Sequence, residues 1–326
     1  MMSKIFWSLV GTLCIAGLIF LSTRVEDLQV ASEPSVEPSQ SGAEPRPRGS
    51  TRTDLIALVT AEEHGLPGEG SGAFVQPGED DVATVVEAAR AALAGKLRTA
   101  SQELAPLGYE VVNFRDAPTG GHHLVFRERA PCQRCWGLFI LNRSPAARDI
   151  VVEAPHPLWD QFTPEMGIQA YLRLDARAFL MAGAHRYANG RDSPVSDMAR
   201  NPRSVFQGVH ELLTDQNSQV LQYHGFDESD HRDYPDVVLS DGGPRPHAGL
   251  SAMKSAIEAQ GARAGIYDGQ HWPDLGATDN PQGQQTRSIG ARFYHMEHDY
   301  AIRKDPARRT AMIEAAYAVL VGGRER

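Results

Sequence analysis

The sequence predicts an α/β domain with a mainly parallel or mixed sheet and helices on both faces. Beyond residue 150, apolar strand-like segments alternate with segments at helical spacing, which is typical of parallel sheets covered by helices. Before that point several strand-like segments follow a helix, which indicates a strand-rich first part. Three later strand-like segments end abruptly in His or a carboxylate, as happens where open α/β sheets present ligands or catalytic groups at their carboxyl edge.

The expected elements follow from this periodicity. Helices are expected over residues 54–64, 80–104, 168–177, 204–213, 249–260 and 306–321. Asp80 and Asp81 are suited to cap the second of these helices. Strands are expected over residues 108–114, 122–128, 136–143, 149–155, 176–183, 219–225, 236–240, 265–268 and 291–298.

Length and charge limit the class of protein. With 326 residues, 41% of them hydrophobic, the chain can bury a sizeable core, and we expect one α/β hydrolase-like domain over residues 54–326. The net charge of -9 and the lack of Lys/Arg-rich blocks interleaved with aromatic residues disfavour a nucleic-acid partner.

The N-terminal region predicts attachment to a membrane. An apolar stretch from Ile5 to Leu21 is intermediate in length between a signal-peptide core and a full membrane span, so residues 1–25 are a signal anchor or a signal peptide. No A-x-A cleavage site follows, which favours the uncleaved anchor. Residues 26–53 are rich in Pro, Ser and Glu and are expected to form a disordered linker. The domain is therefore expected to be membrane-anchored or exported, on the periplasmic or extracytoplasmic side.

Cys132 and Cys135 form the one C-x-x-C of the sequence. A zinc site would need a second pair of ligands at the usual spacing, and no second Cys pair exists. Outside the cytoplasm a local disulfide is expected. A thioredoxin-like role is disfavoured because the pair precedes a strand, whereas the redox motif begins a helix.

The segment from Val151 to Thr163 is the most informative stretch. It places Glu153, His156 and Asp160 together where a strand should end. His156 lies between two prolines, which hold its backbone extended and fix the position of its imidazole.

A zinc site is the favoured interpretation of this segment. His156 and Asp160 would supply two ligands, and His224, at the end of another strand-like segment, would supply the third. Two His and one carboxylate with an open fourth position form a hydrolytic zinc site. Two alternatives remain: the histidines are hydrogen-bonded residues at strand ends, or Glu153 replaces Asp160 as the carboxylate ligand or acts as a partner behind it.

The last strand-like segment carries a candidate acid and base. Alternation along a strand places His295 and Glu297 on one face and His298 on the other. Glu297 is the candidate for proton transfer, with His295 as its companion. The alternative is a solvated strand end.

Arg186 follows the strand-like segment over residues 176–183 and is expected at the same edge of the sheet. Its guanidinium can hold a substrate carboxylate through two parallel hydrogen bonds. The alternative is a surface arginine paired with Asp192 or Asp197. Arg303, in an Arg-rich stretch, is expected at a solvated helix start, and the alternative is a further contact to an anion.

This order of groups resembles the zinc hydrolases of the carboxypeptidase type. The groups are His156 with Asp160 after a first strand, a segment with His185, Arg186 and Asn189, then His224 at a strand end and Glu297 on a C-terminal strand. The nearest families are the N-formylglutamate amidohydrolases and the poly-γ-glutamate hydrolases. The resemblance covers about residues 151–303 and implies a phosphorylase/hydrolase-like α/β fold. The sequence departs from the H-x-x-E of zinc carboxypeptidases, because His156 and Asp160 form H-x-x-x-D.

The resemblance implies zinc-dependent hydrolysis of an amide bond in an acyl-amino acid, a peptide or a cell-envelope peptide. The substrate would be a small molecule or peptide with a carboxylate. The alternative is a non-catalytic, membrane-tethered binding or scaffold module of the same fold. A metal-independent esterase is not expected, because the sequence lacks a G-x-S-x-G elbow.

Overall fold

A computed structural model describes residues 52–229 and 231–322. The predicted anchor over residues 1–25 and nearly all of the predicted linker lie outside this part of the chain. Arg52 and Thr53, the last two residues of the predicted linker, form the short strand β1. Within the described residues, no helix is long and apolar enough to cross a membrane.

One mixed sheet organises the described residues, and its strand order is β1-β2-β3-β4-β6-β5-β7-β10-β8-β9. The strands are β1 (Arg52–Thr53), β2 (Tyr109–Asp116), β3 (His122–Glu128), β4 (Leu138–Asn142), β5 (Arg148–Ala154), β6 (Ala176–Met181), β7 (Gln219–Gly225), β8 (Val237–Ser240), β9 (Ala264–Ile266) and β10 (Arg292–His298). The four central strands β6, β5, β7 and β10 are parallel, and antiparallel pairs lie on both sides of them.

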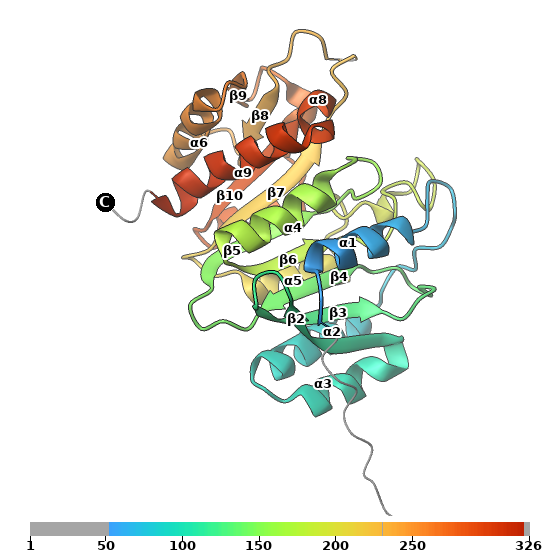
Figure 1. The fold of residues 1–326 in the computed structure, drawn as a ribbon. Helices are drawn as coiled ribbons and strands as arrows, with labels where there is room; N and C mark the ends of the chain where they lie inside the picture. The colour runs from blue at the N-terminus through green and yellow to red at the C-terminus, as the bar shows by residue number, and fades with distance from the viewer. Residues whose placement is uncertain (1–51, 230, 323–326) are drawn as a thin grey trace, which may run out of the picture. The chain divides into compact units, whose positions relative to one another are not determined.

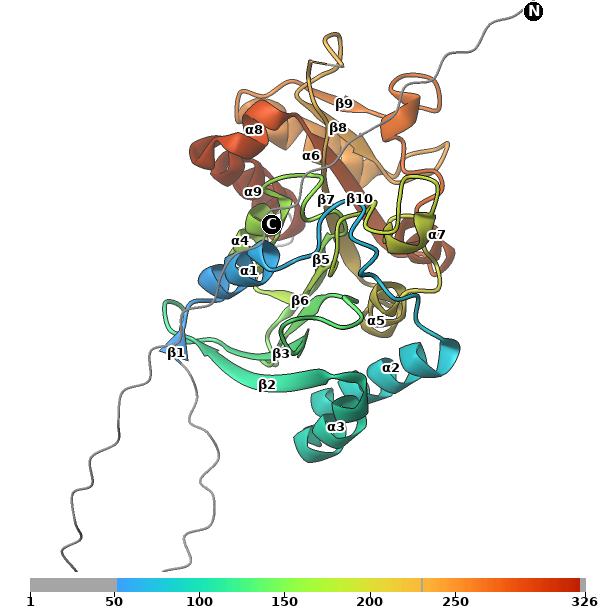
Figure 2. The same ribbon diagram turned by 90° about the vertical axis from the view of Figure 1, so that its right-hand side faces the viewer.

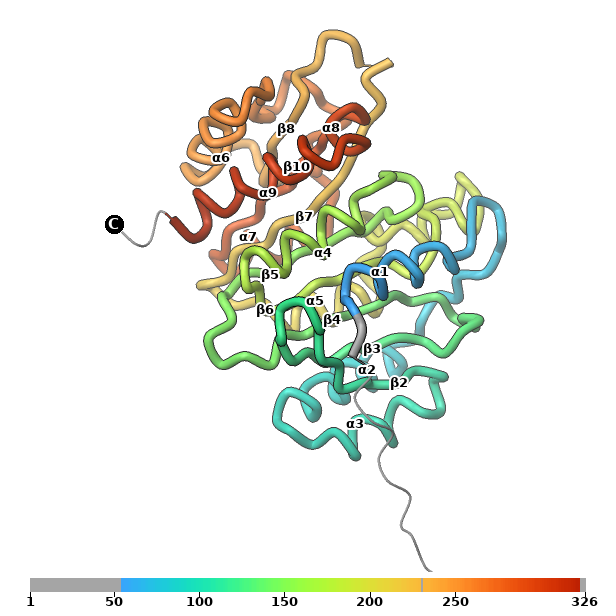
Figure 3. Tube along the Cα trace, viewed as in Figure 1, coloured from blue at the N-terminus to red at the C-terminus, as the bar shows by residue number. Residues whose placement is uncertain are grey.

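Helices cover both faces of this sheet, which confirms the predicted fold class. One face carries α1 (Leu55–His64), α4 (Thr163–Leu174), α6 (Ala248–Ala259) and α9 (Pro306–Leu320), and the other carries α2 (Glu79–Leu93), α3 (Leu97–Leu104), α5 (Val205–Leu213) and α7 (Pro281–Ser288) (Figures 1 and 2). A short helix α8 (Tyr300–Lys304) precedes α9, which packs against α4 and α6 (Figure 3). Single 3-10 turns cover Ala105–Leu107, Pro194–Ser196 and Pro273–Leu275. The sheet therefore separates two apolar cores, one under each helical layer.

Two helix predictions were wrong in detail, and two helices were not predicted. The helix expected over residues 80–104 is broken into α2 and α3, because Gly95 adopts a left-handed φ of 80° between them. The helix expected over residues 168–177 is α4, which begins at Thr163 with Pro164 in its first turn and ends before Asp175, at a left-handed φ of 47°. Helices α7 and α8 were not expected, since their polar sequences lack a clear apolar periodicity.

Cys132 and Cys135 form a disulfide, which is the pairing that the sequence favours for this C-x-x-C. The carboxylate of Glu128 accepts the backbone N–H groups of Gln133, Arg134 and Cys135 at 2.6, 2.7 and 2.7 Å. The disulfide thus closes this loop on itself, and the buried carboxylate of Glu128 holds the loop to the end of β3.

Candidate metal and hydrolytic site

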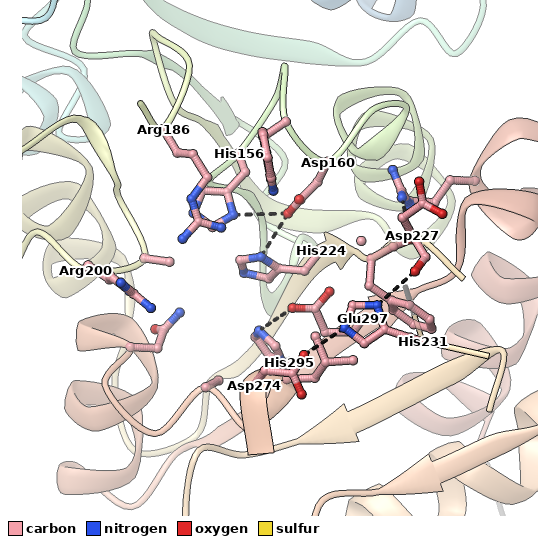
Figure 4. Close-up of a pocket in the computed structure, with 18 of the residues that line it drawn as sticks. His156, Asp160, Arg186, Arg200, His224, Asp227, His231, Asp274, His295 and Glu297 are labelled. Atoms are coloured by element: carbon pink, nitrogen blue, oxygen red, sulfur yellow. Dashed lines mark hydrogen bonds and ion pairs between the residues drawn. The ribbon is translucent and has the colours of Figure 1, made fainter. Parts of the chain in front are cut away.

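The three strand-like segments that end in polar residues meet at one edge of the sheet. Strands β5, β7 and β10 are adjacent and parallel, so their carboxyl ends lie together, and Glu297 pairs in register with His224. His156 follows β5 after one further residue. These side chains line a cavity of about 750 Å³ and point toward its interior (Figure 4).

A turn after β5 places Asp160 beside His156. The backbone N–H groups of Trp159 and Asp160 donate to the carbonyl oxygen of His156 at 3.2 and 2.9 Å. Oδ2 of Asp160 then lies 3.1 Å from Nδ1 of His156 and 3.1 Å from Nδ1 of His224. All three residues are 2–3% exposed. The structure therefore brings the three predicted ligands together, with one atom of each facing a common point.

The outer nitrogen of His156 is fixed as a donor. Its Nε2 lies 2.8 Å from Oδ1 of Asp197, whose other oxygen accepts two hydrogen bonds from Arg186. A carboxylate only accepts here, so Nε2 of His156 carries a proton. In the neutral imidazole the lone pair is then on Nδ1, the nitrogen that faces Asp160.

The outer nitrogen of His224 is fixed in the same way through Gln222. The amide nitrogen of Gln222 donates to Oε2 of Glu153 at 2.9 Å, so the amide oxygen faces His224. Nε2 of His224 lies 2.8 Å from that oxygen and must donate to it. The lone pair of the neutral His224 imidazole is therefore also on Nδ1. Fixing a ligand imidazole by a hydrogen bond on its far nitrogen is how proteins orient metal-binding histidines.

Electrostatics at this point favour a cation. Burial opposes the charge on Asp160, but His156 and His224 hold the pKa of its carboxyl far below the ordinary range. Burial disfavours a charge on His156 too, yet the carboxylates of Asp197 and Asp160 outweigh it and raise the pKa of the imidazole. Burial lowers the pKa of His224, which keeps it neutral. The lone pairs on Nδ1 of His156 and Nδ1 of His224 and the Oδ2 atom of Asp160 repel one another unless a positive ion, either a proton or a metal ion, lies between them.

Glu297 and His295 lie on the other side of His224. Oε1 of Glu297 is 3.6 Å from Nε2 of His295, and the two residues form a second group of close ligand atoms with His224. Oε2 of Glu297 and Nδ1 of His295 are buried without a hydrogen-bond partner among the described residues. Burial raises the pKa of Glu297 well above its ordinary value and lowers that of His295. His295 and Glu297 are therefore buried residues of the cavity wall, and the alternative of a solvated strand end does not describe them.

Glu153 does not belong to either group of ligand atoms. It is fully buried, and its carboxylate is bonded to Nδ1 of His210 at 2.7 Å and to Gln222 at 2.9 Å. Of the two roles considered for Glu153, the structure places it behind His224 as the partner of Gln222, and Asp160 beside the histidines.

Two arginines line the cavity on one side (Figure 4). Arg186 donates from Nε and Nη2 to Asp197 at 3.1 and 2.5 Å, so the pairing with Asp197 considered above is present, although its side chain keeps 16% exposure. Arg200 is exposed and forms no ion pair with another described residue. Arg303, expected at the surface, is 4% exposed and donates to the carbonyl oxygens of Gln161, Phe226 and His298.

Sequence reasoning missed Gln222 and Arg200, and it named Asp197 only as a possible partner of Arg186. The bond from His156 to Asp197 joins positions 41 residues apart, and no local pattern indicates it. Gln222 had a usable signal, because it precedes His224 by two residues and so shares its strand face. Arg200 carried no such signal.

Comparison with known proteins gives a fold likeness only. No family model and no curated protein matches the chain. Similar solved structures include the zinc-free form of a protein called YNDL (TM-score 0.39, 12% identity, 68% of this chain and 96% of that chain). Another is an aspartoacylase family protein from Mesorhizobium loti (TM-score 0.36, 13% identity, 65% of this chain and 67% of that chain). A third is a metallo-carboxypeptidase from Burkholderia cenocepacia (TM-score 0.37, 14% identity, 77% of this chain and 71% of that chain). We therefore take the function from the residues of the site.

Proposed function

We propose that this protein is a zinc-dependent hydrolase of an amide bond in an acyl-amino acid, a peptide or a cell-envelope peptide. One observation carries the proposal: Nδ1 of His156 and Nδ1 of His224 each lie 3.1 Å from Oδ2 of Asp160, while both outer nitrogens are held as donors. This is the arrangement of a metal site whose histidines are oriented from behind.

Zinc fits this donor set best. Two imidazoles and one carboxylate suit Zn²⁺, and three protein ligands leave a fourth position open for catalysis. When bound, zinc would lower the pKa of a water molecule and polarise the carbonyl group of the substrate. The cavity beside these ligands, at about 750 Å³, is large enough for a small peptide or acyl-amino acid.

Glu297 would carry the proton in this reaction. Its carboxyl lies in the same cavity, and Oε2 has no hydrogen-bond partner among the described residues that would compete for a proton. Burial raises its pKa, which favours uptake of a proton from the attacking water and later donation to the leaving nitrogen. His295, kept neutral by burial, would hold the carboxyl of Glu297 in place.

Arg186 and Arg200 would bind the carboxylate of the substrate. Asp197 orients Arg186, which lines the cavity and whose Nη1 has no hydrogen bond to another described residue. Arg200 adds a second positive charge on the same side. A guanidinium can bind a carboxylate through two parallel hydrogen bonds, which an ammonium cannot.

A non-catalytic binding or scaffold module is the less favoured function. Oε2 of Glu297 and Nδ1 of His295 are buried without partners in the part of the chain that the structure describes; such groups destabilise a protein and are expected where chemistry requires them. We also propose that residues 1–25 attach the protein to a membrane with the domain outside the cytoplasm, a location in which the Cys132–Cys135 disulfide would persist.

An activity screen tests the hydrolase. The purified protein, loaded with zinc, is incubated with N-acyl amino acids, γ-glutamyl peptides and muropeptides, with and without a chelator. We expect amide hydrolysis that the chelator abolishes and added zinc restores. A protein that binds these compounds but hydrolyses none of them would support the non-catalytic module instead.

A further inference from the structure

Trp159 exposes an unusually large apolar surface at the cavity. It lies three residues after His156, lines the same cavity and remains 41% exposed, whereas Trp136 is 1% exposed. The other large hydrophobic residues with comparable exposure among the described residues are Val75 and Leu93, and neither lines this cavity. An exposed indole beside a reactive site is a surface on which an apolar group can lie.

The indole is held in place by its neighbours. Tyr187 and His185 contact it edge-on, with ring centroids 5.2 and 5.6 Å away and interplanar angles of 81° and 86°. The Arg191 guanidinium lies 5.5 Å from the Trp159 ring centroid and 4.9 Å from that of Tyr187. We call Trp159, His185, Tyr187 and Arg191 the Trp159 platform.

Residues 67–72 support the platform from behind. The carbonyl oxygen of Pro67 accepts the backbone N–H of His185 at 3.0 Å, and the N–H of Gly70 donates to the carbonyl of Tyr187 at 3.0 Å. Glu69 forms an ion pair with Arg191 at 2.7 Å. The platform therefore exists before a ligand arrives, so a ligand that covers it loses little entropy in ordering protein side chains.

The platform adjoins the proposed carboxylate-binding arginine. His185, Arg186 and Tyr187 are consecutive, and the guanidinium carbon of Arg186 lies 5.1 Å from the Tyr187 ring centroid. A carboxylate held at Arg186 thus places the next substituent of the same amino acid close to Tyr187 and Trp159. The Arg191 guanidinium already occupies a cation position near the Trp159 ring, which disfavours a second cation there and leaves an apolar substituent as the better fit.

We propose that the Trp159 platform is the subsite for an apolar, preferably aromatic, side chain on the amino acid that carries the substrate's carboxylate. This inference rests on the proposed function for the role of Arg186, and it names the substrate class. Amino acids with small or cationic side chains at that position are the poorer ligands.

The test compares two probes that share an acetyl group and a carboxylate and differ only in the side chain: N-acetylphenylalanine and N-acetylglycine. Binding is measured by calorimetry on the full zinc-loaded chain carrying Glu297→Gln, which suppresses turnover. The phenylalanine probe is expected to bind about tenfold or more tightly than the glycine probe, since one well-placed apolar contact gives roughly 10- to 200-fold discrimination. Trp159→Ala should reduce this ratio to about twofold, and Trp159→Phe should restore most of it.

Controls separate the platform from general effects. Leu93→Ala removes another exposed apolar residue, which lies on α2 outside the cavity, and should leave the ratio unchanged. If Trp159→Ala does not fold, Tyr187→Ala provides the second variant, and it should lower the ratio in the same direction. An unchanged ratio in the folded variant, or no binding of either probe, would overturn the platform. A normal preference without any hydrolysis by the wild-type protein would overturn the hydrolase and leave the platform standing.

Discussion

His156 donates a hydrogen bond from Nε2 to Oδ1 of Asp197 at 2.8 Å, across 41 residues of sequence. The same carboxylate accepts two hydrogen bonds from Arg186 through its other oxygen. One buried acid therefore orients both a proposed metal ligand and the arginine proposed to bind substrate. Positive charge and hydrogen bonds from both partners hold the pKa of Asp197 well below its ordinary value, against the effect of burial.

Asp197→Asn should impair both functions of this residue. An amide keeps the shape but loses the charge, so it no longer fixes the tautomer of His156 or the guanidinium of Arg186. Zinc affinity is expected to fall about 10- to 100-fold, as for other partners of ligand histidines. Titration with a competing zinc indicator measures this. Asp192→Asn, on the exposed part of the same loop, is the control, and equal affinities in the two variants would refute the orienting role.

Glu297→Gln should separate chemistry from metal binding. The substitution keeps the size of the side chain and removes the basic oxygen, so zinc content and thermal stability should remain near wild type. Turnover should fall by about a hundredfold or more, because positioned acid/base groups typically contribute 10² to 10⁴ in rate. Steady-state kinetics on any substrate of the wild type checks this. Near-normal turnover would remove Glu297 from the mechanism and direct attention to His295.

Glu153→Gln should lower stability without removing zinc. Its carboxylate is bonded to His210 and Gln222 in a fully buried position, so the amide leaves one of these donors unsatisfied. The free energy of unfolding is expected to fall by about 1–3 kcal/mol. Urea unfolding and metal analysis measure the two effects. Loss of zinc in Glu153→Gln together with retention in Asp160→Ala would show that Glu153, and not Asp160, is the ligand.

Glu63 gives a pH dependence that lies outside the site. Burial, with a smaller contribution from Glu165, raises the pKa of Glu63 from 4.5 to about 7. Between these values the folded protein binds this proton more tightly than the unfolded chain does. Stability therefore falls as the pH rises through this window, and the loss is complete above about pH 7.

Glu63→Gln should remove that loss. The variant is expected to gain more stability over wild type at pH 8 than at pH 5, as measured by urea midpoints. Glu87→Gln, at an exposed position on α2, is the control, and it should change the urea midpoint by the same amount at both pH values. A gain for Glu63→Gln that is the same at both pH values would contradict the assigned burial of its charge.

Much of the site follows from strand ends. Apolar runs that stop in His156, His224 and Glu297 could be recognised in the sequence, and parallel neighbours necessarily bring such ends to one edge. The fold class followed from the alternation of strands and helices. In contrast, the break in the helix expected over residues 80–104 could not be predicted, because composition does not supply the left-handed backbone conformation of Gly95.

The partners behind the ligands depend on contacts that are distant in the sequence. Asp197, in the loop after β6, is hydrogen-bonded to His156, and Glu153 on β5 is hydrogen-bonded to His210 on α5. The sequence separations of these two pairs, 41 and 57 residues, match no helix or strand periodicity from which the contacts could be predicted. The choice between Glu153 and Asp160 therefore depended on the side-chain direction at the end of β5, which only the three-dimensional structure supplies.

Metal analysis of the purified full-length protein tests the central claim most directly. After dialysis against zinc and then buffer, mass spectrometry should find about one zinc ion per chain in the wild type. His156→Ala and His224→Ala should each lose it, because every deprotonated ligand contributes strongly to affinity. His271→Ala, an exposed histidine outside the cavity, should keep it. A wild type without zinc, or zinc retained in both ligand variants, would contradict the site.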